Sequence, residues 1–255
     1  MVMRDMAARP ARAVGQFVLM AAQTCAVGFT HPLAWREMLI QMWFVARVSI
    51  VPTLLLAIPF TVLVVFLFNI LLIEFGAADF SGVGAATVAV TQIGPIVTVL
   101  VIAGAGATAM CADLGSRTIR EELDALRVLG INPLQTLVVP RVIAATLVAM
   151  LLTSAVSVVG LVGSYVFAVF VQHTNPGAFA ESLTVLVGLP DVIVALVKAA
   201  LFGLSAGLIA CFKGTTVGGG PAGVGNAVNE TVVYSFIALF FINVIATAVG
   251  VKATA

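Results

Sequence analysis

The ionisable side chains of this sequence concentrate in one stretch, SRTIREELDALRVLG, at residues 116–130. Charges come there every second or third residue, whereas only 9% of the whole chain is charged and 62% is hydrophobic. A charged segment of this kind has two uses in an apolar chain. It keeps a loop in water, or it presents a patterned face that a soluble partner grips.

The same stretch predicts a short helix with defined ends. Thr118 and Glu121 have the T-x-x-E spacing of a capping box, which starts helices. Gly130, followed by Asn132 and Pro133, is a typical stop signal. The helix predicted over 118–130 is too short to cross a bilayer, which takes about 20 apolar residues.

The surface of this predicted helix combines an apolar stripe with charge. Side chains at i, i+4 and i+7 form the stripe: Ile119, Leu123 and Leu126. Two i,i+4 pairs of opposite charge are expected beside it: Arg117/Glu121 and Arg120/Asp124. Such pairs contribute roughly 0.2–0.5 kcal/mol each, so stability is a weak reason for them. A coupling helix for a soluble partner and a solvated loop helix both fit these residues.

The surrounding composition excludes an ordinary soluble domain, which is typically about 45–50% apolar and about 25% charged. Five apolar segments predict an all-α membrane protein: 48–73, 84–112, 134–171, 187–212 and 227–251. We expect one membrane-embedded domain over residues 1–255. The net charge of +1 gives no long-range field that would attract nucleic acid.

The segment 13–46, before the first predicted span, is less apolar than the spans. Pro32 interrupts it, and Trp35 and Trp43 then belong to a set of apolar positions at helical spacing, with Arg36 beside them. This pattern favours an amphipathic elbow helix in the membrane interface over a sixth span.

Positive residues are unevenly distributed among the linkers. Arginines precede the first span and lie between the second and third, and Lys213 follows the fourth. The linkers at about 74–83 and 172–186 contain neither Lys nor Arg. Because short cytoplasmic loops collect these residues, we expect the N-terminus, the charged stretch and the 213–226 loop in the cytoplasm. The chain is then a multi-pass protein of the plasma (inner) membrane.

The sequence has no recognisable catalytic or metal-ligating arrangement. His31 and His173 are isolated, and there is no HExxH or GxSxG motif and no metal cluster. The G-x-x-x-x-G-K-S/T loop that cradles nucleotide phosphates is also absent, so energy from ATP has to arrive through another chain. We therefore expect no enzyme activity, and no metal or cofactor bound by this chain.

Two ionisable residues inside predicted spans are candidate polar membrane sites. Lys198 lies near the middle of the fourth span, where a charge is costly and often functional. Glu230 lies only a few residues into the last span, so the two differ in depth by more than a salt bridge allows. For Lys198 we expect a partner or lipid headgroup, a local polar partner, or a side chain that extends to the interface.

Residues 112–144, ADLGSRTIREELDALRVLGINPLQTLVVPRVIA, resemble the signature of the MlaE/YrbE permease family. That signature has an acidic-Leu-Gly turn, Glu-x-x-Asp-Ala-Leu, a Gly-x-x-Pro turn and Pro-Arg. This chain supplies Asp113-Leu114-Gly115, Glu121/Glu122-Leu123-Asp124-Ala125-Leu126, Gly130-Ile131-Asn132-Pro133 and Pro140-Arg141. The glycine-rich loop at 218–225 is a second match, and the resemblance covers about residues 30–250.

One departure from the family pattern indicates a branch. Many members carry an Arg after Ala-Gly in the second span, whereas residues 103–107 here read Ala-Gly-Ala-Gly-Ala. Together with Cys-Ala-Asp-Leu-Gly at 111–115, this looks like the actinobacterial YrbE branch, which works with mammalian-cell-entry (Mce) proteins.

The resemblance implies the permease subunit of an ATP-driven Mce importer for a lipid such as a fatty acid, sterol or phospholipid. Its implied partners are a second YrbE-type permease in a heterodimer, a cytoplasmic ATPase dimer that binds ATP and Mg²⁺, and Mce proteins on the outer side. The implied ATPase contact comprises Glu121, Glu122, Asp124, Ala125 and Leu126, with Arg117 and Arg120.

Three other functions are alternatives to a permease. An ion-coupled secondary transporter would need acidic residues near mid-bilayer and repeated halves, and neither is evident in the sequence. An intramembrane enzyme lacks the motifs described above. A membrane scaffold for a lipid-transfer complex is the remaining alternative.

Overall fold

A computed structural model describes residues 2–30, 34–76, 81–172, 175–183 and 187–254, which are almost entirely helical and contain no strand. The α-helices are α1 (Val2–Thr30), α2 (Trp35–Glu74), α3 (Ser81–Val88), α4 (Gly94–Val101), α5 (Ala107–Ile119), α6 (Glu122–Val128), α7 (Val139–Phe170), α8 (Pro176–Ser182), α9 (Leu189–Thr215) and α10 (Gly220–Thr254). Three short π-helical segments join them: η2 (Ala89–Ile93), η3 (Ile102–Gly106) and η4 (Leu134–Val138).

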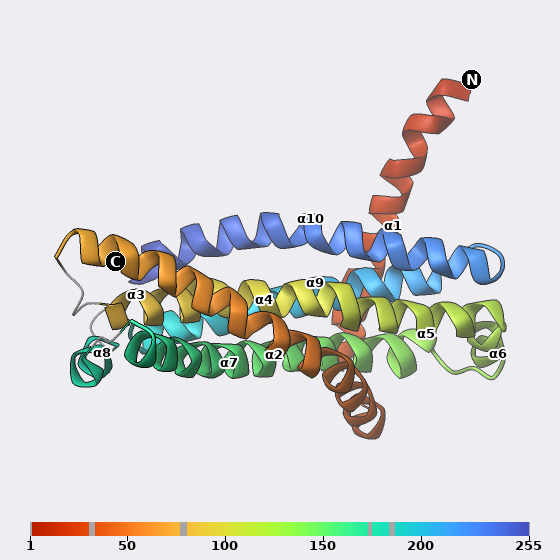
Figure 1. The fold of residues 1–255 in the computed structure, drawn as a ribbon. Coiled ribbons are helices and arrows are strands. Elements are labelled where there is room, and N and C mark those ends of the chain that lie inside the picture. The colour runs from red at the N-terminus through yellow and green to blue at the C-terminus, as the bar shows by residue number, and fades with distance from the viewer. Residues whose placement is uncertain (1, 31–33, 77–80, 173–174, 184–186, 255) are drawn as a thin grey trace.

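Five helical segments are long and apolar enough to cross a membrane. They are Trp35–Leu72, Gly82–Ile119, Leu134–Phe170, Leu189–Thr215 and Gly220–Gly250. They run lengthwise in an elongated bundle (Figure 1). Each overlaps one of the five spans expected from the sequence, so the prediction of an all-α membrane protein is confirmed.

The predicted elbow helix at 13–46 is not a single element. The helix α1 ends at Thr30, and Trp35 opens α2, which continues through Pro52 and Pro59 to Glu74. The helix α1 leaves the bundle at a steep angle, and the first turns of α2 bend away from the rest of that helix (Figure 1). The prediction of an elbow helix separate from the first span is wrong, because the amphipathic turns at the start of α2 continue into its apolar turns without a break. The predicted stop at Pro32 lies outside the described residues.

The second span forms the centre of the bundle. Of its most apolar stretch 61% is buried, against 11% for the last span. The π-helical segments η2 and η3 interrupt this span on either side of α4. An added Cβ at Gly106, in η3, would lie 3.2 Å from a methyl of Val45, so the missing side chain there lets α2 approach closely.

Small residues set the separation of α7 and α9. A Cβ at Gly203 would lie 2.7 Å from the Ala145 carbonyl oxygen and 2.8 Å from the Thr146 Cα. At Gly207 it would lie 3.2 Å from the Ala145 Cβ. Glycines in membrane helices allow such close backbone contact, and it gives packing attraction where lipid leaves no hydrophobic driving force.

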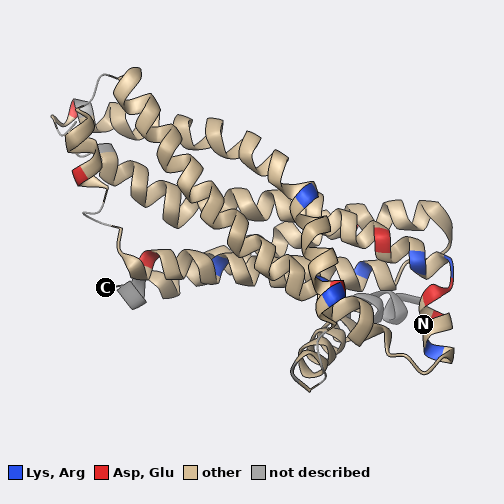
Figure 2. Ribbon diagram, turned by 90° about the horizontal axis from the view of Figure 1, so that it is seen from below, with Lys and Arg blue, Asp and Glu red and all other residues tan. Residues whose placement is uncertain are grey.

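Charged residues gather toward one end of the bundle, which holds α6 and the first turns of α7 (Figure 2). We call it the charged end. At the opposite end, the described residues that Figure 2 colours are acidic. Glu74 ends α2 there, and Asp191 lies in the first turn of α9. The charged end therefore carries charges of both signs, whereas the coloured residues of the opposite end are acidic alone.

Gly203→Ala should destabilise the protein by about 1–3 kcal/mol, because the new methyl meets backbone atoms of α7 that cannot yield like a flexible side chain. Thermal unfolding of the purified protein in detergent measures this as a lower Tm. Gly104→Ala is the matched control, since a Cβ there has no atom within 4 Å. Equal Tm values for the two variants would contradict the close packing of α7 on α9.

Candidate partner-binding site at the charged end

The charged stretch folds as two helices with a hinge between them, and the predicted capping box is wrong. The helix α5 continues to Ile119, and α6 begins at Glu122. Between them, Glu121 adopts a left-handed conformation with φ of 58°, the one positive φ at a non-glycine residue in the described chain. The hydroxyl of Thr118 caps no helix. It donates to the carbonyl oxygens of Leu114 and Gly214, both at 2.9 Å.

The predicted stop at Gly130 is confirmed. Gly130 has a φ of +74°, which glycine adopts without strain. The backbone N–H of Ile131 donates to the Leu126 carbonyl at 2.9 Å, and that of Gly130 donates to Arg127 at 3.0 Å. These bonds satisfy carbonyls that the end of α6 would otherwise leave unpaired.

The two predicted i,i+4 ion pairs do not form. The structure pairs Arg117 with Asp113 at 3.4 Å, Arg120 with Glu122 at 3.0 Å, and Arg127 with Asp124 at 2.6 Å. The predictions failed because the left-handed turn at Glu121 breaks the helical spacing on which they depend. The Arg120 and Arg127 pairs are largely exposed, so each contributes little to stability.

The predicted apolar stripe is divided between the protein interior and the surface. Leu123 is 4% exposed and packs with residues of α5, η4 and α9, whereas Ile119 is 37% exposed. Beyond the stripe, Val128 and Leu129 are 88% and 72% exposed. The tip of the charged end thus presents apolar side chains within a charged surface, a pattern typical of protein-binding sites.

A groove of about 490 Å³ runs between α6, η4 and the start of α2. Its lining is mostly apolar, with charged residues among it: Ala34, Glu37, Arg117, Glu122, Ala125, Leu126, Leu129, Thr136 and Leu137. Four of the residues predicted to contact a partner therefore share one concave surface. The other three, Arg120, Glu121 and Asp124, are exposed on α6 or its hinge but do not line the groove.

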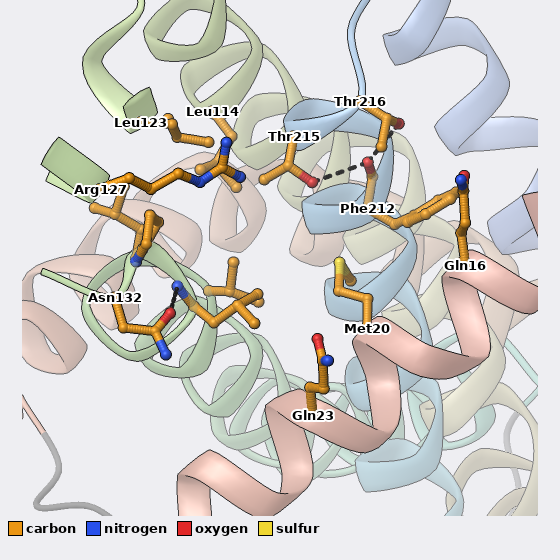
Figure 3. Close-up of a pocket in the computed structure, with 14 residues that line it drawn as sticks. Gln16, Met20, Gln23, Leu114, Leu123, Arg127, Asn132, Phe212, Thr215 and Thr216 are labelled. Atoms are coloured by element: carbon orange, nitrogen blue, oxygen red, sulfur yellow. Dashed lines mark hydrogen bonds between the residues drawn. The ribbon is translucent and has the colours of Figure 1, made fainter. Parts of the chain in front are cut away.

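A second cavity, of about 380 Å³, shares Leu137 with the groove and is lined on one side by α1 (Figure 3). Gln16, Met20 and Gln23 of α1 face Arg127 and Asn132 across it (Figure 3). The ring of Phe17 packs edge-on against Phe212 of α9, with their centroids 5.5 Å apart. The helix α1 thus contacts the base of the α6 region as well as α9.

An ion pair between the buried Arg141 and the partly buried Asp113 anchors α5 to α7, and sequence reasoning missed it. The side chain of Arg141 is 0% exposed, and its Nη2 lies 2.5 Å from an Asp113 carboxylate oxygen. Its Nη1 donates to the Leu137 carbonyl at 2.9 Å. The sequence signal was available, because Arg141 stands alone in the first apolar turns of a span.

A second link joins α9 to α10 near the charged end. The Lys213 ammonium lies 2.6 Å from a carboxylate oxygen of Glu230 and 4.5 Å from the centre of the Tyr234 ring. Glu230 is therefore no partner of Lys198, as their depths predicted. Lys198 lies far along α9 and donates to the Thr91 carbonyl at 3.3 Å.

Asp113→Asn should destabilise the protein by about 3 kcal/mol, because it leaves the buried Arg141 guanidinium without a counter-charge. Asp124→Asn makes the same chemical change in an exposed pair and should cost less than about 1 kcal/mol. Chemical or thermal unfolding of both variants in detergent tests this. Similar losses in the two variants would show that the Arg141 pair contributes no more than a surface pair.

Comparison with known proteins bears on the family. Residues 38–249 match the family described as Permease MlaE. A probable ABC transporter permease protein of Synechocystis sp. is 38% identical over 152 residues, which are 60% of this chain and 58% of that protein. One of Rickettsia typhi is 34% identical over 156 residues, 61% of this chain and 60% of that protein.

A plant protein is also similar. The chloroplastic protein TRIGALACTOSYLDIACYLGLYCEROL 1 of Arabidopsis thaliana is 33% identical over 149 residues, which are 58% of this chain and 43% of that protein. The chain thus spans about three fifths of the length of the bacterial relatives named above. Because the family match covers most of the chain, including all of α3 to α9, this membrane protein belongs to the MlaE permease family.

Proposed function

We propose that this chain is the membrane permease subunit of an ATP-driven lipid transporter, and that an ATPase binds the α6 region. The observation that carries the proposal is the groove beside α6. It is mostly apolar and contains opposite charges, and the residues that face α6 across it belong to the start of α2, the end of α5 and η4, which are parts of the membrane spans. A solvated loop needs no such groove, whereas a helix that transmits force to the spans does.

Force on α6 has a short route into the bundle. The Thr118 hydroxyl joins the end of α5 to the Gly214 carbonyl of α9. At the same crossing, a Cβ on Gly214 would lie 2.8 Å from the Leu114 Cβ, so α5 and α9 touch without a side chain between them. A displacement of α5 therefore moves α9 directly.

The two ion pairs extend this route to the neighbouring spans. Asp113 and Arg141 connect α5 to α7, and Lys213 and Glu230 connect α9 to α10. Four of the five spans are thus joined at the charged end by polar contacts. This arrangement favours movement of the helices together over local bending of one loop.

The energy source in this proposal is a separate chain. The printed sequence contains no G-x-x-x-x-G-K-S/T loop, and the bacterial relatives are named as permeases of ABC transporters. ATP and Mg²⁺ would bind to an ATPase dimer on the cytoplasmic side, beneath α6. The excess of Arg toward the charged end supports this orientation in the plasma (inner) membrane, with the N-terminus in the cytoplasm.

The proposal that the substrate is a lipid is supported by the name of one relative. The name of the Arabidopsis relative refers to a diacylglycerol lipid, and that protein is 33% identical to this chain over 149 residues. The departure at 103–107 and the Cys-Ala-Asp-Leu-Gly run at 111–115 support a place in the Mce-associated branch. A second, different permease chain and Mce proteins on the outer side complete the proposed importer.

The variant Ala125→Trp tests the proposal, because it fills the groove from an exposed position and leaves the core unchanged. We expect at least a tenfold loss of ATPase that co-purifies with the tagged chain from its native membranes, detected by mass spectrometry. ATP-dependent uptake of radiolabelled palmitate and phosphatidylcholine by membrane vesicles should fall in parallel.

Ala155→Trp is the matched control, since Ala155 lines an apolar groove between α2 and α7 far from α6 in the sequence. It should keep normal ATPase binding. Undiminished ATPase binding by a folded Ala125→Trp protein would refute the docking site. Lipid uptake driven by an ion gradient without ATP would instead identify a secondary transporter.

A further inference from the structure

Lys198 lacks the carboxylate counter-charge that the buried Arg141 and the partly buried Lys213 have. Its side chain is 2% exposed, nine residues and about 14 Å into α9 from Leu189. An ammonium group has three donors, yet its single hydrogen bond goes to the neutral carbonyl of Thr91 at 3.3 Å. Within the described chain no carboxylate forms an ion pair with it.

The surroundings of Lys198 contain further unsatisfied polar groups. A cavity of about 210 Å³ beside it is lined by Thr87, Thr91, Gln92, Asp191, Val194, Ala195, Lys198, Thr247 and Gly250. The hydroxyls of Thr87 and Thr247 are buried and have no hydrogen-bond partner. Since buried polar groups are normally paired, this cavity is built for a polar ligand.

A second, apolar cavity of about 300 Å³ adjoins the first between α9 and α10. It is lined by Ile193, Val194, Val197, Lys198, Leu201, Ile242, Ile245, Ala246, Val249 and Gly250. Val194, Lys198 and Gly250 line both cavities, so the ammonium group stands where the polar space meets the apolar one. Many of the apolar residues are exposed on the bundle surface, where lipid would lie.

We infer that this pair of cavities binds a single-chain amphiphile with a small anionic headgroup, a carboxylate or a phosphate monoester. The headgroup would accept from Lys198 and the two threonine hydroxyls, and the acyl chain would lie between α9 and α10. Liquid water occupies about 30 Å³ per molecule, so the polar cavity has room for a small headgroup but not for a large sugar. The single apolar cavity that adjoins it, between α9 and α10, would hold one acyl chain.

Asp191 does not supply the missing counter-charge. It lies seven residues before Lys198, which is about 10 Å along the helix. Its carboxylate accepts instead from the backbone N–H of Gly188 at 2.9 Å, at the start of α9. The inference rests on the proposed lipid transport and deepens it by naming the headgroup class and the helices that hold it.

The test uses the purified chain in detergent, without ATPase or ATP, so its failure would leave the ATPase-docking proposal intact. The probes are palmitate, hexadecyl phosphate and hexadecanol, each with a photoreactive diazirine in the chain, and mass spectrometry locates the crosslinks. Either or both anions should label α9 and α10 around 193–201 and 242–249 at least tenfold more strongly than the alcohol. Equal labelling by acid, phosphate and alcohol would overturn the inference.

Two sets of variants sharpen the result. Lys198→Met should reduce anion labelling at least tenfold, whereas Lys198→Arg, which keeps the charge, should retain most of it. Ala246→Phe, which fills the apolar groove and leaves Lys198 in place, should also reduce labelling, and Ala155→Phe should not. If Lys198→Met fails to fold, the Ala246→Phe comparison and the three probes on the unmodified chain still decide. Labelling of folded Lys198→Met at the original level would refute the site.

Discussion

The charged end of this protein depends on the guanidinium group of Arg141. A cation with no exposed surface, inside a bundle of Val, Leu and Ala, is tolerated only beside a counter-charge, and Asp113 supplies it. The helices α5 and α7 cannot separate there without exposing that charge to an apolar environment. Since α7 also packs against α2 and α9, one ion pair fixes the base on which the hinge and α6 stand.

Arg141, Lys213 and Lys198 show that the charge of a cation within a span is compensated in different ways. Arg141 and Lys213 each have a carboxylate on a neighbouring helix, and both lie toward the charged end. Lys198 lies toward the other end of the bundle and has a backbone carbonyl alone. The first two are accounted for by helix assembly. The third is better accounted for by a ligand, because helix assembly leaves its charge uncompensated.

Features that depend on local composition could be predicted from the sequence. The five spans follow from runs of apolar residues. The end of α6 follows from Gly130, because glycine readily adopts the positive φ found there. Features that depend on distant contacts could not. The Thr118–Glu121 spacing suggested a helix start, but the Thr118 hydroxyl bonds to Gly214, 96 residues away, and α5 continues past it.

The candidate site was predictable to a similar extent. Arg117, Glu122, Ala125 and Leu126 were chosen from a motif, and they meet in one groove only because η4 and the start of α2 close it. The role of Arg141 was missed because its partner lies 28 residues earlier on another helix. Lys198 was singled out by depth alone, while its two cavities depend on how α10 packs against α9.

The π-helical segments in the second span have a consequence for how this sequence can vary. Each π turn accommodates one residue more than an α turn, so η2 and η3 each shift the angular phase of everything that follows by about 100°. A single repeat of 3.6 residues therefore cannot describe the buried face of the span from Gly82 to Ile119. A one-residue deletion within η2 or η3 could be absorbed by restoring α-helical geometry there. The same deletion in α4 would turn Asp113 away from Arg141.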